Sequence, residues 1–316
     1  MRVFPFSRAV GRVVAGLGVS AGEVLPRLLG PPARRALSSA IDLVPVRVLR
    51  SGCGVLESAI VDEDGRLFFT SQTWCGSKGA ILRMDSPDAD VEEVVCGIVS
   101  PGGLAWAQDG SLIAGYGDSP HGGLIGNWVG LAGMLRVDPK TGACERWVRG
   151  LGMANGVACA PDGTVYASND IGTHLDRINP DGTVDRRWAR VASANGLAID
   201  RAGRFLYAAQ TFVAARVSRI DLQDPDSVVT HARSPAGASA SMLDGLTIDK
   251  TGQLFVAANG AGQVWRIDGD GIIHVLASGL RCPSAVALGN GPVGFSEGNA
   301  CAVTFAGDVV ELQNAC

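Results

Sequence analysis

Residues 154–170 read ANGVACAPDGTVYASND, and this stretch holds the pattern that decides the fold. A short apolar run is followed by a Pro-Asp-Gly turn and a second apolar run. A polar residue, Asn155, stands eight residues before the turn glycine, Gly163. The same spacing recurs through the chain. Counting back eight residues from Gly65, Gly110, Gly163, Gly203, Gly252 and Gly291 gives Glu57, Gly102, Asn155, Asn195, Asp244 and Pro283. We call these last six residues the marker positions.

The spacing between the repeats indicates the architecture. Successive turn glycines are roughly 40–53 residues apart, which is the length of a four-stranded blade in a β-propeller. Each unit reads as strand, turn, strand, loop, strand, hairpin and strand, with turns rich in Asp and Gly. No long helical periodicity follows residue 45, which excludes a fold of alternating strands and helices. The sequence therefore predicts an all-β fold, a six-bladed β-propeller.

The two ends of the repeat region predict how the ring closes. Residues 45–52, PVRVLRSG, resemble the last strand of a unit without its first three, whereas the last unit has text for three strands. We therefore expect the N-terminal strand to complete the last blade, which leaves no open sheet edge. Residues 1–43 are predicted to form a short helical arm, and residues 44–316 the catalytic propeller.

Composition limits the partners that we expect. Of 316 residues, 47% are hydrophobic and 18% charged, the net charge is −4, and no basic block suggests nucleic acid. No apolar run reaches the roughly 18 residues of a membrane-spanning helix, so no integral membrane segment is expected. Arg8, Arg12 and Glu23 interrupt the N-terminal apolar text, which makes it a poor secretion signal. We predict a cytoplasmic protein, with export or association of the arm with a membrane surface left open.

The eight cysteines show no CxxC pair and no zinc-site spacing. Four of them lie in strand-like text and are expected to be buried, reduced thiols: Cys96, Cys144, Cys159 and Cys301. A disulfide between Cys53 and a C-terminal cysteine is an open alternative.

The marker positions predict a functional site. In a propeller the first strand of each blade lines the central channel, and each marker stands where that strand begins. Glu57, Asn155, Asn195 and Asp244 would therefore meet at one mouth of the channel. Such oxygen donors, without sulfur or imidazole, suit Ca²⁺ first, then Mg²⁺ or Mn²⁺, and Zn²⁺ less well. The alternative is that Asn-Gly and Asp-Gly are turn dipeptides with no role as ligands.

Four motifs carry a resemblance to a known family: LESAIVDEDG, ANGVACAPDG, ANGLAIDRAG and LDGLTIDKTG. With them the chain resembles the family of gluconolactonase, senescence marker protein and luciferin-regenerating enzyme, and more distantly paraoxonase and diisopropyl fluorophosphatase. The resemblance implies a catalytic divalent metal, usually calcium, held by Glu57, Asn155, Asn195 and Asp244. It also implies hydrolysis of a small-molecule lactone or ester, with phosphotriesters as a further class.

One marker departs from the family pattern. Sugar lactonases have an Asn-Asp-Gly stretch at the start of the second blade, and one of its side chains reaches the substrate. This chain instead reads SPGGLAW, with Gly102 and Gly103. The missing side chain is expected to loosen the pocket, and it weakens the case for a sugar-acid lactone as the substrate.

The predicted mechanism assigns two catalytic residues. A bound metal would polarise the carbonyl or phosphoryl group, and Asp244 is expected to act as general base toward water or as direct nucleophile. His121, in the long loop of the second blade, is either a proton shuttle or an ordinary surface histidine. The mouth loops predict a substrate pocket of Trp74, Gly102, Asn169, Asp170 and Gln210. The same loops also contain Asp118, Trp128, His174 and Asn259.

Two other function classes stay open. The second class keeps the same fold and metal site but performs a non-hydrolytic reaction, as a biosynthetic lyase, isomerase or cyclase, or as a propeller like strictosidine synthase. A propeller fold does not fix the reaction. The third class is a binding propeller without catalysis, against which the concentration of oxygen ligands argues.

Overall fold

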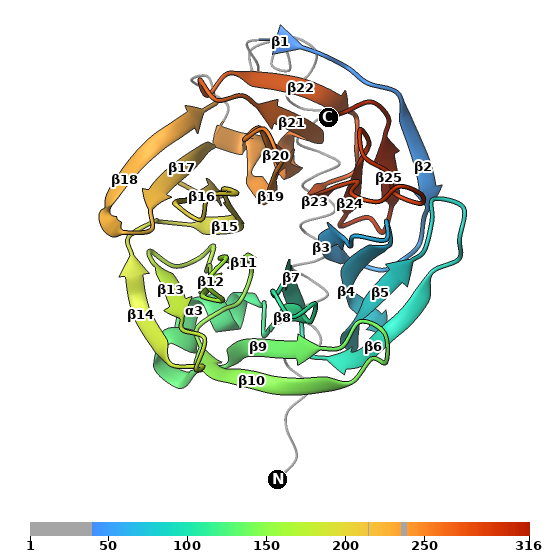
Figure 1. Cartoon of the computed structure of the whole chain (residues 1–316). Coiled ribbons are helices and arrows are strands. Elements are labelled where there is room, and N and C mark those ends of the chain that lie inside the picture. The colour runs from blue at the N-terminus through green and yellow to red at the C-terminus, as the bar shows by residue number, and fades with distance from the viewer. Residues whose placement is uncertain (1–39, 214, 235–238) are drawn as a thin grey trace.

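The computed structural model describes residues 40–213, 215–234 and 239–316. Six antiparallel sheets surround a central channel, as Figure 1 shows, and the predicted six-bladed propeller is thereby confirmed. The predicted N-terminal arm lies outside the described residues except for residues 40–43. No helix in the described ranges is long and apolar enough to cross a membrane.

Each blade is numbered here from its innermost strand outward. Blade one consists of β3 (Leu56–Val61), β4 (Leu67–Cys75), β5 (Lys78–Met84) and β6 (Glu92–Ile98). Blade two consists of β7 (Pro101–Trp106), β8 (Leu112–Tyr116), β9 (Ala132–Val137) and β10 (Cys144–Leu151). Blade three consists of β11 (Val157–Cys159), β12 (Val165–Ala167), β13 (Leu175–Ile178) and β14 (Val184–Ala189).

The second half of the ring repeats this order. Blade four consists of β15 (Ala194–Ile199), β16 (Phe205–Gln210), β17 (Arg216–Asp221) and β18 (Asp224–Arg233). Blade five consists of β19 (Leu243–Ile248), β20 (Leu254–Ala258), β21 (Gln263–Ile267) and β22 (Ile273–Ser278). Blade six takes β23 (Pro283–Leu288), β24 (Ala300–Thr304) and β25 (Val309–Leu312) from the C-terminal end of the chain.

The outer strand of blade six comes from the other end of the propeller sequence. β2 (Val46–Arg50) pairs antiparallel with β25, with Val46 opposite Leu312, and Figure 1 shows this blue strand beside the red ones. A shorter strand, β1 (Ala40–Ile41), pairs in parallel with β22 and adds a fifth strand to blade five. The sequence did not predict β1, whose two residues lie before the expected propeller boundary.

Short helices occur only in connections of the described residues. α3 (Pro120–Val129) lies between β8 and β9, in the longest loop of blade two. The 3₁₀ turns η1 (Ser239–Ser241) and η2 (Asn259–Ala261) precede and follow strands of blade five. The sequence analysis did not predict α3, because three glycines and a proline obscure its helical pattern.

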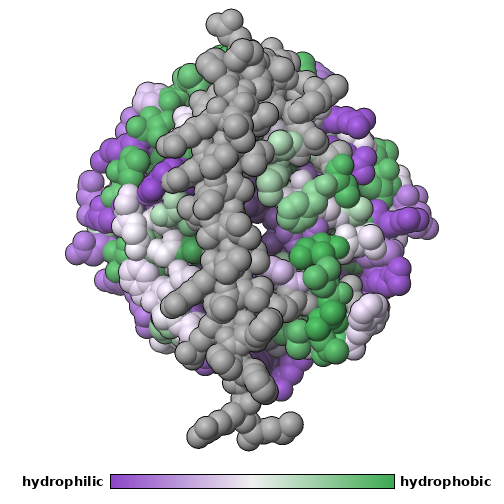
Figure 2. Space-filling view, turned by 180° about the vertical axis from the view of Figure 1, so that it is seen from behind, coloured by the Kyte–Doolittle hydropathy of each residue, from purple (hydrophilic) through white to green (hydrophobic). Residues whose placement is uncertain are grey.

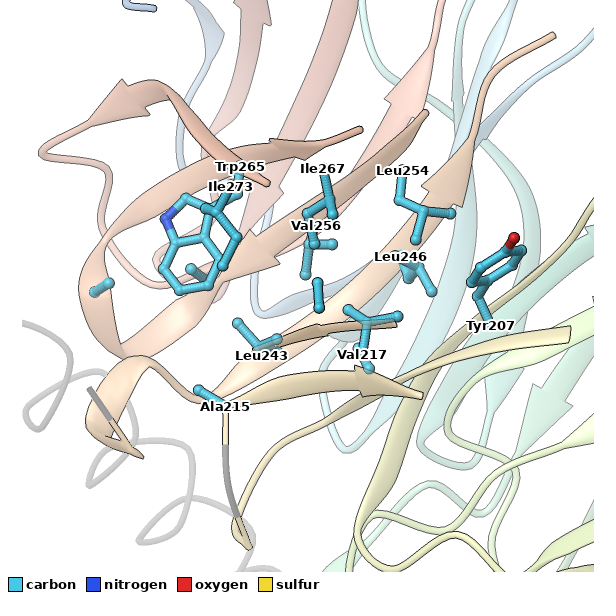
Figure 3. Close-up of a cluster of buried hydrophobic side chains, with 14 of the residues drawn as sticks. Tyr207, Ala215, Val217, Leu243, Leu246, Leu254, Val256, Trp265, Ile267 and Ile273 are labelled. Carbon is cyan, nitrogen blue, oxygen red and sulfur yellow. The ribbon is translucent and has the colours of Figure 1, made fainter. Parts of the chain in front are cut away.

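The hydrophobic core lies between neighbouring blades. Figure 3 shows one such interface, in which Val217 of blade four lies beside Leu246 and Val256 of blade five, and Trp265 belongs to the same cluster. Trp265 is fully buried, and its indole N–H donates to Gln263 Oε1 at 2.7 Å. Burial of this kind around the whole ring makes the blades one rigid support for the channel.

The channel has two distinct ends. First strands begin at the end that we call the mouth face, and the connections between second and third strands return there. First strands end at the opposite face, which we call the turn face. The turn-face connections contain fifteen carboxylates against five basic residues. The carboxylates are Asp62, Glu63, Asp64, Asp85, Asp88, Asp90, Asp109, Asp138, Asp162, Asp181, Asp200, Asp249, Asp268, Asp270 and Glu297.

The mouth face instead exposes large apolar side chains. Of the seventeen exposed large hydrophobic residues in the described part of the chain, ten lie on mouth connections or strand ends beside them. We call these ten the apolar rim: Trp74, Val99, Leu124, Ile125, Trp128, Val129, Leu131, Ile171, Phe212 and Val213. Figure 2 views this face, on which hydrophobic surface (green) gathers beside the centre.

The cysteines differ from the expectation in three places. Cys159 is free but only partly buried. Cys96 forms a disulfide with Cys75, so it is not a reduced thiol. The bond joins β4 to β6 across the intervening strand β5. Cys144 is free but exposed, at the start of the outer strand β10. Cys301 is buried and free as expected, and so is Cys53, which forms no disulfide.

Candidate functional site

Four marker side chains lie buried at the mouth end of the channel. Each stands at or just before the first strand of its blade, as the spacing predicts, and each is no more than 8% exposed. They are Glu57, Asn155, Asn195 and Asp244. Their side chains are therefore held by the innermost strands of blades one, three, four and five, which are the most constrained parts of the ring.

Close packing explains why a glycine follows the marker in blades two to five. A Cβ on Gly103 would lie 2.6 Å from the carbonyl oxygen of Asn155, and one on Gly196 would lie 2.5 Å from that of Asp244. A Cβ on Gly156 would overlap the carbonyl oxygen of Asn195. Each marker backbone therefore rests against the glycine of the preceding blade.

This packing decides against the turn-dipeptide alternative for the Asn-Gly and Asp-Gly pairs. None of the four glycines has the positive φ that would make it a left-handed turn residue. In blades one and six a serine takes the equivalent position and forms hydrogen bonds instead. Ser58 Oγ accepts from the backbone N–H of Leu104 at 3.1 Å, and Ser284 Oγ donates to the carbonyl of Leu56 at 2.7 Å.

Gly102 does not loosen the pocket, contrary to the sequence-based expectation. A Cβ at this position would overlap the carbonyl oxygen of Ala154, because the chain entering blade three passes directly over it. The Gly102 carbonyl accepts from Thr70 Oγ1 at 3.1 Å, and Gly103 N donates to Asn155 O at 2.5 Å. Backbone of blade three thus fills the space that a side chain would take.

A pair of carboxylates is held together by two amide side chains. Gln72 Nε2 donates to Glu57 Oε2 at 3.3 Å and to Asp118 Oδ2 at 2.9 Å. Asn155 Nδ2 donates to Asp118 Oδ1 at 3.2 Å and lies 3.5 Å from Glu57 Oε1. Both donors bridge the same two acids, so Glu57 and Asp118 keep a fixed geometry without a basic residue between them.

Asp244 has its own amide partners on the other side of the channel. Asn259 Nδ2 donates to Asp244 Oδ2 at 3.2 Å, and the side chain of Asn195 forms a second hydrogen bond with this carboxylate. These contacts fix the plane of the carboxyl group. They join markers of blades four and five into one unit.

The buried acids raise one another's pKa. Burial raises the pKa of Glu57 well above its usual range, and the negative charges of Asp118, Asp244 and Asp170 raise it further. Burial followed by the charge of Asp170 also raises the pKa values of Asp118 and Asp244. Burial raises the pKa of Asp170 to about 6. No basic side chain is among the causes of these four shifts.

Below the acids the channel is a cavity of about 530 Å³. Its walls are the first strands, which present apolar residues such as Leu104, Val157 and Leu246. At the turn face it is bordered by Asp249 and Lys250. The polar ligand set is therefore confined to the mouth end, where a substrate would meet it.

The predicted pocket residues occupy different environments. Trp74 is 38% exposed at the mouth end of β4. Asn169 is buried, and its Nδ2 donates to the carbonyl of Gly123 at 3.2 Å, which holds the loop of blade three against α3. Gln210 is fully buried, donates to Ala192 O at 2.6 Å and accepts from Arg216 and Ser218, which ties it to blade packing.

His121 lies within α3, but its side chain is outside the described residues. Its predicted role as a proton shuttle therefore stays a prediction. His174 lies near the surface, with its Nδ1 2.8 Å from Thr173 Oγ1, as expected of a structural histidine.

Sequence reasoning did not include Gln72 or Asp118 in the proposed ligand set. A second spacing could have found Gln72, because it follows Glu57 by fifteen residues, as Asp170 follows Asn155 and Asn259 follows Asp244. Fifteen residues span the hairpin formed by the first and second strands of a blade. The residue at each end of this spacing therefore lies at the mouth face. Asp118 follows β8 in the blade whose own marker is Gly102, and it fills the gap that this glycine leaves in the ring of acids.

The residues present fit a hard divalent cation. Four carboxylates with raised pKa values and no nearby base form a site that a bound cation would neutralise. Asp170 Oδ1 is buried and has no hydrogen-bond partner, which is unusual for a carboxylate oxygen. The side-chain amide oxygens of Asn155 and Asn195 add neutral ligand atoms of the kind that Ca²⁺ accepts.

A softer cluster occurs elsewhere. Among the described residues, one set of three Cys, His or acid ligand atoms lies within 4.8 Å of one another: Cys75, Glu93 and Cys96. It lies in the outer part of blade one and includes the disulfide, whose sulfur atoms are not free to bind metal. The predicted ligands of the marker site contain no sulfur, and half of them are amide side chains.

Comparison with known proteins agrees with the fold. Residues 166–293 match the sequence profile of the SMP-30/gluconolactonase/LRE-like region. No curated protein matches the sequence. A gluconolactonase from Xanthomonas campestris superposes with a TM-score of 0.68 at 16% identity, covering 89% of this chain and 93% of that one.

Two further solved structures have related folds. Regucalcin from Agrobacterium tumefaciens, described as a calcium-binding protein, has a TM-score of 0.65 at 16% identity, covering 87% of this chain and 95% of its own. Virginiamycin B lyase from Staphylococcus aureus has a TM-score of 0.54 at 14% identity, covering 85% and 88%. At such identities the likeness is one of fold. The matched profile and the six-bladed fold confirm the resemblance inferred from the sequence: over residues 166–293 the chain is similar to the SMP-30/gluconolactonase/LRE-like region.

Proposed function

We propose that this protein is a divalent-metal-dependent hydrolase of a small-molecule lactone or ester, phosphotriesters included. The observation that carries the proposal is the buried set of oxygen donors at the mouth, in which Asp170 Oδ1 has no partner. The family that residues 166–293 resemble includes gluconolactonase, which makes a lactone the first substrate class to test.

Glu57, Asn155, Asn195 and Asp244 would hold the cation. Carboxylate and amide oxygens favour Ca²⁺, with Mg²⁺, Mn²⁺ and Zn²⁺ as alternatives of decreasing fit. The solved regucalcin structure is that of a calcium-binding protein, which supports the same order. When bound, the cation would supply Lewis-acid polarisation of a carbonyl or phosphoryl group.

The protein residues then orient the acids and move the proton. Asn195 and Asn259 fix the Asp244 carboxylate, which we assign as the base toward water or as the nucleophile. Gln72 and Asn155 hold Glu57 and Asp118 at a constant separation, so the negative charge opposite Asp244 does not shift during reaction. Asp170, Trp74 and the loop held by Asn169 would contact the substrate.

The test combines metal content with turnover. The chelated protein should lose activity on lactone, aryl ester or phosphotriester probes and recover it with Ca²⁺. Asp244→Asn should lower kcat/KM on the order of 100-fold or more. Asp109→Asn, at the turn end of a first strand, is the matched control and should keep both metal binding and turnover. Retention of the cation by both Asp244→Asn and Glu57→Gln would show that the ligand assignment is wrong.

A second candidate keeps the fold and the cation but not hydrolysis. The backbone that fills the Gly102 position leaves no side chain there to reach a sugar lactone, which weakens the sugar-lactonase reading specifically. A lyase, isomerase or cyclase is the alternative, and a propeller of this fold is already known as a lyase. Tight Ca²⁺ binding without turnover of any lactone, ester or phosphotriester would favour it. In either case we propose a cytoplasmic protein with a propeller from residue 44 onward.

A further inference from the structure

The apolar rim is a surface without an occupant in the described structure. Trp128 is 85% exposed, Leu124 65% and Phe212 59%, and the three come from blades two and four, on either side of blade three. Single exposed hydrophobic residues are common on proteins, but ten on one face mark an interaction surface. The rim lies beside the channel mouth on blades one to four, so whatever covers it also meets the substrate entrance.

The charges beside the rim are positive. Lys78, Arg149, Arg190 and Arg233 are exposed at the mouth ends of strands or in mouth connections. The described mouth connections contain three carboxylates, Asp118, Asp170 and Asp308, and none of them is exposed. The turn face is the reverse, with fifteen carboxylates against five basic residues in its connections. The molecule therefore has one apolar, basic face and one acidic face.

The N-terminal segment carries the same chemistry as the rim. Residues 1–39 contain six arginines and one glutamate, a net charge of 6 − 1 = +5, whereas residues 40–316 carry −4 − 5 = −9. The segment is otherwise rich in Val, Leu and Phe. A surface that attracts both this segment and the mouth face must combine negative charge with an apolar interior.

We propose that the mouth face docks on an anionic lipid surface, with the apolar rim inserted among the acyl chains and the basic residues against the headgroups. Aromatic and aliphatic side chains flanked by Lys and Arg are the composition that binds such interfaces. Docking of residues 1–39 on the rim is less favourable, because both partners are basic. Pairing of two rims is disfavoured for the same reason.

Docking would orient the channel. The mouth would face the lipid, and the acidic turn face would be repelled from it, so the substrate would arrive from the membrane and carry an apolar group. This consequence rests on the proposed function, but docking itself does not. The protein can therefore hydrolyse a substrate without binding vesicles, or bind vesicles without hydrolysing a substrate, so the two proposals can fail separately.

The experiment uses the full chain and large vesicles of phosphatidylcholine, alone or mixed with phosphatidylserine. We expect co-sedimentation with the mixed vesicles that weakens with salt, and a blue shift of tryptophan fluorescence. Leu124→Glu combined with Trp128→Glu should abolish the binding. Arg190→Glu and Arg233→Glu should each weaken it more than about fivefold, because one basic residue near an anionic surface is worth ~1 kcal/mol.

Turn-face variants provide the matched controls. Val293→Glu and Lys250→Glu change equally exposed residues on the acidic face and should leave vesicle binding unchanged. All substituted side chains are exposed, so thermal unfolding should confirm an intact fold. Absence of binding to mixed vesicles, or equal loss in rim and turn-face variants, would overturn the proposal. So would a dimer, or rim amides protected by residues 1–39 in hydrogen exchange without lipid.

Discussion

The turn face and the mouth face use acidic residues in opposite ways. At the turn face, aspartates such as Asp109 and Asp181 accept hydrogen bonds from the hydroxyl and the backbone N–H of the residue two positions further on, and these bonds lower their pKa. At the mouth, Glu57 and Asp244 are buried, and burial raises their pKa. Fewer than ten residues separate the two environments along a strand.

The difference teaches that one repeat can carry a local role and a collective one. A turn aspartate such as Asp109 or Asp181 satisfies N–H groups of its own turn, so it needs no partner from another blade. The mouth acids depend on partners from other blades, because Gln72 and Asn155 bridge Glu57 to Asp118 across two blade boundaries. Local roles stabilise each blade, and the collective one creates a site only when the ring is closed.

The contrast between the two faces would fail most clearly if a mouth acid could be neutralised without loss of Ca²⁺ binding. Asp244→Asn should weaken Ca²⁺ binding by roughly 100-fold or more, since loss of a single outer partner of a ligand already costs about 10–100-fold. Calorimetric titration of the chelated protein measures this effect. Asp181→Asn, at the turn end, should bind Ca²⁺ as the unchanged protein does. Similar losses in both variants would mean that the mouth acids are not a distinct group.

A second test concerns the packing that brings the markers together. Gly156→Ala should lower the free energy of unfolding by about 1–3 kcal/mol, because the added Cβ would overlap the carbonyl oxygen of Asn195. Gly269→Ala is the control, since a Cβ there meets nothing within 4 Å. Denaturant unfolding of both variants measures the difference. An unchanged Gly156→Ala protein would show that the first strands do not abut as described.

The sequence predicted what is local and repeated. The marker spacing gave the six blades and the mouth location of Glu57, Asn155, Asn195 and Asp244, because strand length and turn position are written in consecutive residues. It could not predict the meaning of Gly102, whose neighbour Ala154 lies more than fifty residues away and excludes a side chain by contact. The same limit applies to partnerships across blades.

The hydrogen bonds to Asp118 are an example of a partnership between blades that the sequence could not predict. Its two amide donors, Gln72 and Asn155, come from blades one and three, and no text near GYGDSPHG points to them. The disulfide between Cys75 and Cys96 was missed for a related reason. The two cysteines lie on β4 and β6, and their pairing across β5 follows from strand register rather than from spacing.

The third prediction separates the two groups of acids by pH. Without a divalent cation, Asp170 keeps its proton up to about pH 6, whereas in the unfolded chain it would lose it near its ordinary pKa of 3.8. The native state thus binds more protons over this range, so its stability should fall as pH rises from about 4 through 6. Glu57, Asp118 and Asp244 have raised pKa values and act in the same direction.

Thermal unfolding of the chelated protein at pH 5 and pH 7 measures this effect. The melting temperature should be several degrees higher at pH 5, and saturating Ca²⁺ should remove or reverse the difference, because protons and the cation compete for the same oxygens. Asp170→Asn should reduce the pH dependence of the chelated protein. A chelated protein that becomes more stable toward pH 7 would contradict the assignment of the mouth acids.

The smallest expected effect belongs to a single turn aspartate. Asp109 Oδ1 accepts from Ser111 N at 3.0 Å and from Ser111 Oγ at 2.6 Å, and its side chain is exposed. Asp109→Ala should therefore lower the free energy of unfolding by no more than about 1 kcal/mol, because water replaces part of the lost hydrogen bonding. Because the hydrogen bonds lower the pKa of Asp109, they stabilise its ionised form, and the loss should shrink as the pH falls below the ordinary pKa of 3.8. Denaturant unfolding at several pH values measures this loss. A loss that persists at low pH would show that Asp109 acts through packing with its blade rather than through the hydrogen bonds of its own turn. The contrast between the turn face and the mouth face would then fail at this position.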